Sequence, residues 1–183
     1  MTAQPLSGTH HSTANGWFAV ASILFISWTL VGCQPPKPAD ATPKQYDIID
    51  VKDANKGVGT YTVPQNTAIM SEPNAKQILY GQRLLNETKR LLPDNTGANM
   101  NCNSCHIANG KEQKGAPYVN SYYTYPKKMP RAGKVVDLEM RINGCFQRSM
   151  NGKPLDVNSK EMQAMLAYMA WLSEGLPKNA KIA

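Results

Sequence analysis

Hydrophobic residues recur every three or four positions in three segments of the chain, and this spacing predicts three amphipathic helices. The first follows Ser71, has a proline near its start and ends near Pro93. Its apolar positions are Ile78, Leu79, Leu85 and Leu92. Gly81 lies inside this helix at a cost of about 1 kcal/mol in helix propensity, and a close contact with another helix would account for it.

The second predicted helix is capped by Asp137 and runs to about Met150, before an Asn-Gly turn. One face carries Leu138, Ile142, Cys145, Phe146 and Ser149. We therefore expect the thiol of Cys145 to point inward. The third helix starts at Ser159 and ends before Gly175. Its methionine-rich stripe is expected in the core, and consists of Met162, Met165, Leu166, Met169 and Leu172.

The remaining segments lack helical periodicity. Residues 110–133 contain several prolines and four tyrosines, which predicts a long irregular loop that packs against something. Residues 33–66 are rich in Pro, Lys, Asp and Gly, with extended pieces only at 46–51 and 60–63. The pattern predicts an all-α domain of about four helices with a long Pro/Tyr loop over residues 67–183, preceded by a linker and extended arm over 33–66.

The first 32 residues contain no charged side chain, and an apolar run extends from Trp17 to Leu30. This run suits an export signal better than a membrane-spanning helix, which needs about 20 largely apolar residues. The following Leu-Val-Gly-Cys resembles a bacterial lipobox, although no Lys or Arg precedes the apolar run. We expect residues 1–32 to be a lipoprotein signal peptide and Cys33 to be lipidated; an uncleaved anchor is the alternative. Both place the chain in the periplasm on a membrane, and Gln34 favours the outer membrane.

The net charge of +7 is unevenly distributed. Between Lys111 and Lys153 there are nine Lys or Arg residues and three acidic ones. This excess is either ordinary solvated surface or a positive field that attracts anionic substrates and acidic protein partners. Aromatic residues are not interleaved with the basic ones, so we expect no nucleic-acid partner.

The stretch "NCNSCH" contains Cys102, Cys105 and His106 in a CxxCH motif. Such a motif attaches haem c through two thioethers, with the histidine as an axial iron ligand. A zinc site would need further Cys or His ligands, yet His106 is the only histidine outside the first 32 residues. A redox-active CxxC would need a strand-helix context that the pattern lacks. We therefore predict one covalently bound haem c.

The residue that occupies the second axial position of the iron would determine the function of the haem. Met129, next to a proline in the loop, is the ordinary choice for electron transfer, because a thioether raises the potential and closes the site. Cys145 is the unusual choice, because a thiolate lowers the potential and is itself nucleophilic. The alternative is that Cys145 is a buried, inert thiol that packs as a small hydrophobic residue. The residues alone leave these alternatives open.

Several stretches together resemble the N-terminal haem domain of thiosulfate dehydrogenases, periplasmic c-type cytochromes that join two thiosulfates into tetrathionate. The resemblance covers about residues 66–175 and includes "NMNCNSCHIANG", "APYVNSYYTYP", "RINGCFQRSMNG" and "SKEMQAMLAYMAWLS". It implies that Cys145 is the distal haem ligand. It also brings Arg141 and Arg148 beside that cysteine as candidate binders of sulfur anions, with a surface or haem-propionate role as the alternative.

The family proteins also have a second haem domain, whereas this sequence shows one CxxCH motif. We therefore expect a membrane-tethered monohaem cytochrome that transfers electrons to a redox protein, with another cytochrome as one such partner, in thiosulfate or related sulfur metabolism. The alternative is a thiosulfate dehydrogenase-like enzyme that acts at Cys145 with a partner haem subunit. A third class, a ligand-binding sensor, requires an open sixth position that carbon monoxide could occupy.

Overall fold

The computed structural model describes residues 43–50, 52–53, 55–177 and 180–182. These residues belong to one compact unit, Pro36–Ala183. The predicted signal peptide over residues 1–32 and the predicted lipidation site Cys33 lie outside the described residues.

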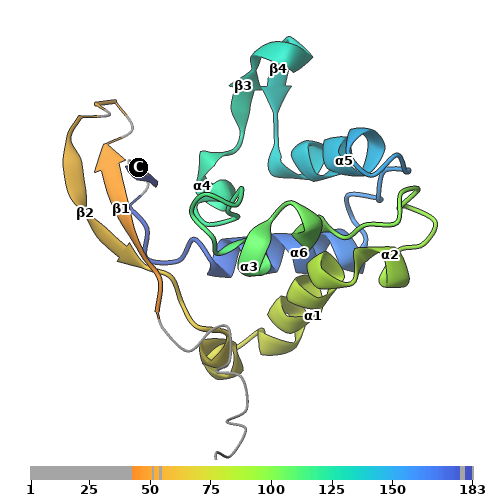
Figure 1. The fold of residues 1–183 in the computed structure, drawn as a ribbon, viewed down its shortest axis with the longest axis horizontal. Coiled ribbons are helices and arrows are strands. Elements are labelled where there is room, and N and C mark those ends of the chain that lie inside the picture. The colour runs from red at the N-terminus through yellow and green to blue at the C-terminus, as the bar shows by residue number, and fades with distance from the viewer. Residues whose placement is uncertain (1–42, 51, 54, 178–179, 183) are drawn as a thin grey trace, which may run out of the picture. The chain divides into compact units, whose positions relative to one another are not determined.

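Two crossing helices form the frame of the fold, α1 (Ala75–Asn86) and α6 (Lys160–Trp171) (Figure 1). Gly81 of α1 lies at the crossing, where a Cβ atom would come within 1.9 Å of the carbonyl oxygen of Ala164. The expected close helix contact is therefore confirmed. The hydroxyl of Ser159 accepts a hydrogen bond from the amide of Met162 and caps α6, as predicted. The methionine-rich stripe of α6 is buried in the core.

Short elements surround this frame. The 3-10 helix η1 (Asn66–Ser71) precedes α1, and α2 (Thr88–Leu91) continues it towards Pro93. The CxxCH region consists of η2 (Cys102–Ser104) and α3 (Ile107–Gly110). Helix α5 (Leu138–Arg148) starts at Asp137, whose carboxylate accepts a hydrogen bond from the amide of Met140. Within the described ranges, no helix has the length and hydrophobicity that crossing a membrane requires.

The extended pieces expected in the N-terminal arm are confirmed as strands, and they pair into a sheet. Strands β1 (Gln45–Asp50), β2 (Gly57–Thr62) and β5 (Ala180–Ile182) form an antiparallel sheet in the order β2-β1-β5. The hydroxyl of Tyr61 donates to the carbonyl oxygens of Leu172 and Glu174, which joins the sheet to the end of α6. Burial raises the pKa of Tyr61 to about 12, so this phenol stays neutral and keeps its proton for these bonds.

The predicted irregular loop also contains regular structure. Helix α4 (Ser121–Thr124) is followed by β3 (Lys127–Met129), the 3-10 turn η3 (Pro130–Ala132) and β4 (Lys134–Val136). The two strands pair as an antiparallel hairpin (Figure 1). The all-α prediction is therefore wrong in part, because the largely helical domain also contains a three-stranded sheet and a two-stranded hairpin. The strands that the sequence did not predict have three residues each, too few for an alternating pattern to be recognised.

Candidate functional site: a cavity between the CxxCH segment and helix α5

A cavity of about 400 Å³ lies between the segment that carries the CxxCH motif and helix α5. Its walls are mainly apolar and include Leu85, Pro117, Val119, Leu138, Ile142, Phe146, Met150 and Met169. Three residues singled out in the sequence, Cys102, His106 and Cys145, line it together. Cys105 is exposed and does not line it. The cavity thus unites two sequence regions about forty residues apart.

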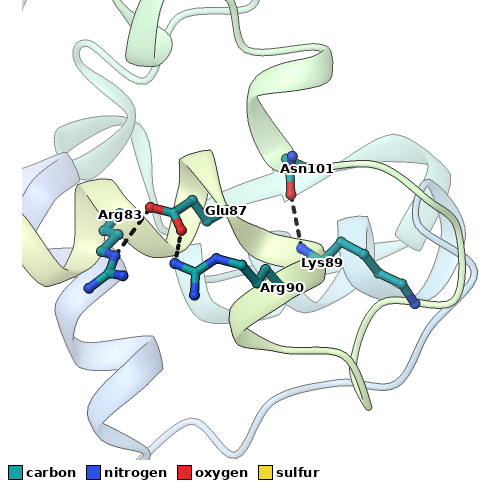
Figure 2. A network of polar contacts seen from close by, with 5 residues as sticks. All are labelled: Arg83, Glu87, Lys89, Arg90 and Asn101. Atoms are coloured by element: carbon teal, nitrogen blue, oxygen red, sulfur yellow. Dashed lines mark hydrogen bonds and ion pairs between the residues drawn. The ribbon is translucent and has the colours of Figure 1, made fainter.

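The turn that carries the cysteines is held by short-range polar contacts. Asn101 and Ser104 form a capping box around η2, and the amide of His106 donates to the carbonyl of Cys102 at 3.0 Å. The side-chain oxygen of Asn101 also accepts the amide of Lys89 at 2.9 Å, which ties this turn to α2 (Figure 2). The neighbouring cluster of Arg83, Glu87 and Arg90 in the same view lies on the exposed side of these helices.

Thr88 lies between α1 and the attachment turn and contacts Cys102 twice. Its hydroxyl accepts the Cys102 amide at 3.0 Å and lies 3.3 Å from the thiol sulfur. Burial raises the pKa of the Cys102 thiol to about 11, and the Thr88 contact opposes this shift only partly. The thiol is therefore neutral at physiological pH in the absence of a bound group, and it faces an apolar cavity.

His106 is oriented by two contacts. Its Nδ1 atom lies within hydrogen-bonding distance of the carbonyl oxygen of Ala116, and its ring stacks on Tyr118 with centroids 4.4 Å apart. Burial lowers the pKa of His106, and the charge of Arg141 lowers it further, while the Ala116 carbonyl opposes both. A neutral imidazole whose Nδ1 bonds a carbonyl leaves Nε2 available to a metal.

Helix α5 contributes the cysteine of the second region. Cys145 is half-buried, and the guanidinium of Arg141, one turn earlier, lies 2.9 Å from its sulfur through Nη1. Arg141 lines the cavity as well, whereas Arg148 does not. The Nε atom of Arg148 instead lies 3.5 Å from the carbonyl oxygen of Gly144. Of the two arginines that flank Cys145 in the sequence, only Arg141 therefore lines the cavity and contacts the sulfur.

Met129 lies outside the cavity. It lines a second hollow, between the β3–β4 hairpin and α5, together with Arg131, Arg141 and Arg148. Of the two distal-ligand candidates from the sequence, only Cys145 lines the same cavity as His106.

The cavity residues fit a haem c. Neither CxxCH thiol is engaged in a disulfide, the histidine ring is fixed by a carbonyl, and the surrounding side chains are apolar. The hydroxyl of Tyr118 and the side-chain oxygen of Asn120 are buried on the cavity wall, and neither has a hydrogen-bond partner among the residues that the structure describes. A buried phenol costs free energy unless it is paired, and haem propionates offer acceptors for such a donor. Among the described residues, no group of three or more His, Cys, Asp or Glu side chains is arranged to hold a metal ion.

Sequence reasoning missed the residues that support the motif. Tyr118 can stack on His106 because Gly110, at φ +70°, leaves room: a Cβ there would lie 1.9 Å from the tyrosine ring. Asn101 and Ser104 have the spacing of a capping box, but Ser104 stands where the sequence signature has Glu or Gln. Thr88 and Ala116 had no sequence signal, because their roles depend on which segments meet in space.

The fold and this cavity define a c-type cytochrome domain, and comparisons with known proteins identify its kind. Residues 93–178 match the family model for the SoxA/TsdA cytochrome c domain. The thiosulfate dehydrogenase of Psychrobacter arcticus is 41% identical over 125 residues, 68% of this chain and 38% of that protein. The thiosulfate dehydrogenase of Allochromatium vinosum is 36% identical over 67% of this chain and 47% of its own length.

A solved structure agrees with these relatives. The thiosulfate dehydrogenase (TsdBA) from Marichromatium purpuratum in its as-isolated form superposes with a TM-score of 0.60 and 27% identity. The match covers 64% of this chain and 26% of that one. The chain therefore carries a SoxA/TsdA-type cytochrome c domain, which holds covalently bound haem c, and the sequence resemblance is confirmed. It spans less than half the length of the curated thiosulfate dehydrogenases it matches.

Proposed function

We propose that this protein is a membrane-tethered, periplasmic monohaem cytochrome c that transfers electrons in thiosulfate oxidation, and that His106 and Cys145 are the residues that would bind the iron. The observation that carries the proposal is that both side chains line one apolar cavity next to the CxxCH thiols. The relatives named thiosulfate dehydrogenase support the link to sulfur compounds.

Each cavity residue has a distinct role in this proposal. Cys102 and Cys105 would hold the haem covalently, and His106 would bind the iron through the nitrogen that Ala116 leaves available. The haem supplies the one-electron chemistry. Arg141 donates a hydrogen bond to the Cys145 sulfur, which orients this sulfur on the cavity wall. The apolar walls exclude water around these groups.

Spectroscopy of the ferric holoprotein tests the ligand pair. We expect a low-spin thiolate signature in electron paramagnetic resonance that disappears in Cys145→Ala. Met129→Leu is the matched control, because Met129 lines the outer hollow, and its spectrum should equal that of the wild type. A spectrum unaltered in Cys145→Ala but altered in Met129→Leu would assign the ligand to methionine.

The membrane tether is tested separately. We propose that Cys33 carries lipid and that the outer membrane is the site of attachment, on the basis of the Leu-Val-Gly-Cys sequence and the following Gln34. Expression of Cys33→Ser in the native host should move the holoprotein from the outer-membrane fraction to another fraction. Retention of Cys33→Ser in that fraction would contradict the lipid anchor.

A second function is favoured by one contact, that between Arg141 and Cys145. A guanidinium beside a sulfur nucleophile can also bind a sulfur anion, as an enzyme that couples two thiosulfates into tetrathionate with release of two electrons would require. Because the chain spans under half of the thiosulfate dehydrogenases, such activity is proposed only together with a partner haem subunit. Tetrathionate formation with an artificial electron acceptor, with and without candidate partner subunits, distinguishes the enzyme from the carrier.

A further inference from the structure

The β3–β4 hairpin, residues 127–136, extends from the body of the domain on the side of α5 (Figure 1). All of its side chains except those of Met129 and Val136 are exposed. Val135 is 60% exposed and Met140, on the neighbouring face of α5, is 45% exposed. Because most of its side chains are exposed, the hairpin contributes little to the packing of the domain.

The hairpin is strongly basic. It carries Lys127, Lys128, Arg131 and Lys134 and no acidic residue. In the part of the chain that the structure describes, none of these four forms an ion pair. Lys127 instead lies 4.9 Å from the ring centre of Tyr125. We call Lys127, Lys128, Arg131, Lys134, Val135 and Met140 the basic hairpin surface.

This surface adjoins the haem cavity. A hollow of about 850 Å³ separates the hairpin from α5, and Arg141 lines both this hollow and the cavity. Lys127 at the base of the hairpin lines the cavity too. A protein that covers the hairpin would therefore lie beside the cavity that holds His106 and Cys145, where electrons leave or enter.

We propose that the basic hairpin surface docks an acidic face of a redox partner protein; this inference rests on the proposed electron-transfer function. Unpaired cations on a projecting element steer an oppositely charged surface, while exposed apolar side chains provide the short-range contact that a protein surface can cover. A second copy of this chain carries the same excess of positive charge at its hairpin and would be repelled.

A small anion fits the hairpin less well than a protein does. Arg131 and Lys134 line the hollow beside α5, but both side chains are exposed, so water would screen their attraction for a bound ion. An anion could still be drawn to Arg141 deeper in the hollow, and an anionic membrane could attract the same cations. Both become outcomes of the test.

The test compares two triple variants of the holoprotein with equal change in charge. Lys128→Glu, Arg131→Glu and Lys134→Glu invert the hairpin and spare Lys127, which lines the cavity. The control inverts three exposed lysines elsewhere, Lys52→Glu, Lys56→Glu and Lys76→Glu. Absorbance spectra and circular dichroism verify that both variants keep haem and fold.

The probe is an acidic blue-copper protein, used in its cupric form as electron acceptor and in its cuprous form for binding by calorimetry. At low ionic strength, the hairpin variant should lose about tenfold or more in both second-order rate and affinity, while the control loses less than about threefold. The salt dependence of the rate should become shallower in the hairpin variant alone.

Four results would overturn the inference. Equal losses of rate and affinity in the two variants would show that the effect comes from overall charge. An unchanged rate and affinity in the hairpin variant would show that this surface does not dock the partner. An equal loss with ferricyanide as oxidant would indicate attraction of small anions. Hairpin-dependent binding to phosphatidylglycerol vesicles without binding to the copper protein would assign the surface to a membrane. If electron transfer fails in the wild type while calorimetry still shows hairpin-dependent binding, the proposed function fails and the docking surface stands.

Discussion

The CxxCH segment and helix α5 both line the haem cavity, but the first is held by contacts with its own neighbouring loop and the second by the packing of a helix face. On the CxxCH side, Asn101, Thr88 and the Ala116 carbonyl each bond a motif residue or its backbone. On the α5 side, Arg141 is the one side chain among the described residues that hydrogen-bonds the Cys145 sulfur. The CxxCH side is therefore suited to hold a bound haem in one position. On the α5 side, the properties of the Cys145 sulfur depend mainly on its contact with Arg141.

The largest effect should come from removing the covalent attachment on the first side. Cys102→Ser with Cys105→Ser should abolish haem retention under denaturing conditions, because no thioether can form. Haem staining after denaturing electrophoresis measures this loss. Cys145→Ser is the control and should stain like the wild type; equal loss of stain there would mean that α5 also anchors the group covalently.

The packing of the CxxCH side is tested at Gly110. Gly110→Ala forces a Cβ into the Tyr118 ring and adds strain at φ +70°, whereas Gly133→Ala, at φ +65°, meets no atom within 4 Å. Both should lose about 1 kcal/mol from the backbone, and Gly110→Ala a further ~1–3 kcal/mol from overpacking. Chemical denaturation of both holoproteins measures the difference. Equal stabilities would show that the Tyr118 ring moves aside freely.

A smaller loss is expected from the cap of the attachment turn. Asn101→Ala removes the bond to the Lys89 amide and should cost about 1 kcal/mol in unfolding free energy. Glu87→Gln, in the exposed cluster shown beside it in Figure 2, should cost under about 0.5 kcal/mol because water screens such pairs. If Glu87→Gln lost more unfolding free energy than Asn101→Ala, the ion pairs of Glu87 would stabilise this region more than the Asn101 cap does.

Substitutions on the α5 side should change the midpoint potential of the haem more than the free energy of unfolding. If Cys145 binds the iron, Arg141→Gln removes a positive charge and a hydrogen bond from the sulfur, and both losses favour the oxidised state. The midpoint potential should fall by tens of millivolts, measured by redox titration. Arg148→Gln should shift it less, because that guanidinium contacts a backbone carbonyl of α5 instead. Equal shifts would point to a general field effect.

The helices show how far sequence reasoning reached. The caps at Asp137 and Ser159 were predicted correctly because a cap and its helix are neighbours in the chain. The expected contact at Gly81 followed from the cost of glycine within a helix. The extended pieces that form β1 and β2 were predicted correctly. Their pairing with β5 and the β3–β4 hairpin were missed, because β5 pairs with a strand more than a hundred residues earlier and three-residue strands leave weak patterns.

By itself, the sequence determined the attachment motif, since a CxxCH acts through residues that are adjacent in the chain. It also determined that the thiol of Cys145 belongs to the inner face of its helix. Only the tertiary structure decided that this face meets the cavity of His106, that Met129 lies outside it, and that Arg141 rather than Arg148 reaches the sulfur. These outcomes depend on how α5 and the hairpin pack against distant segments, and helical spacing orders the side chains of one helix without stating what each will face.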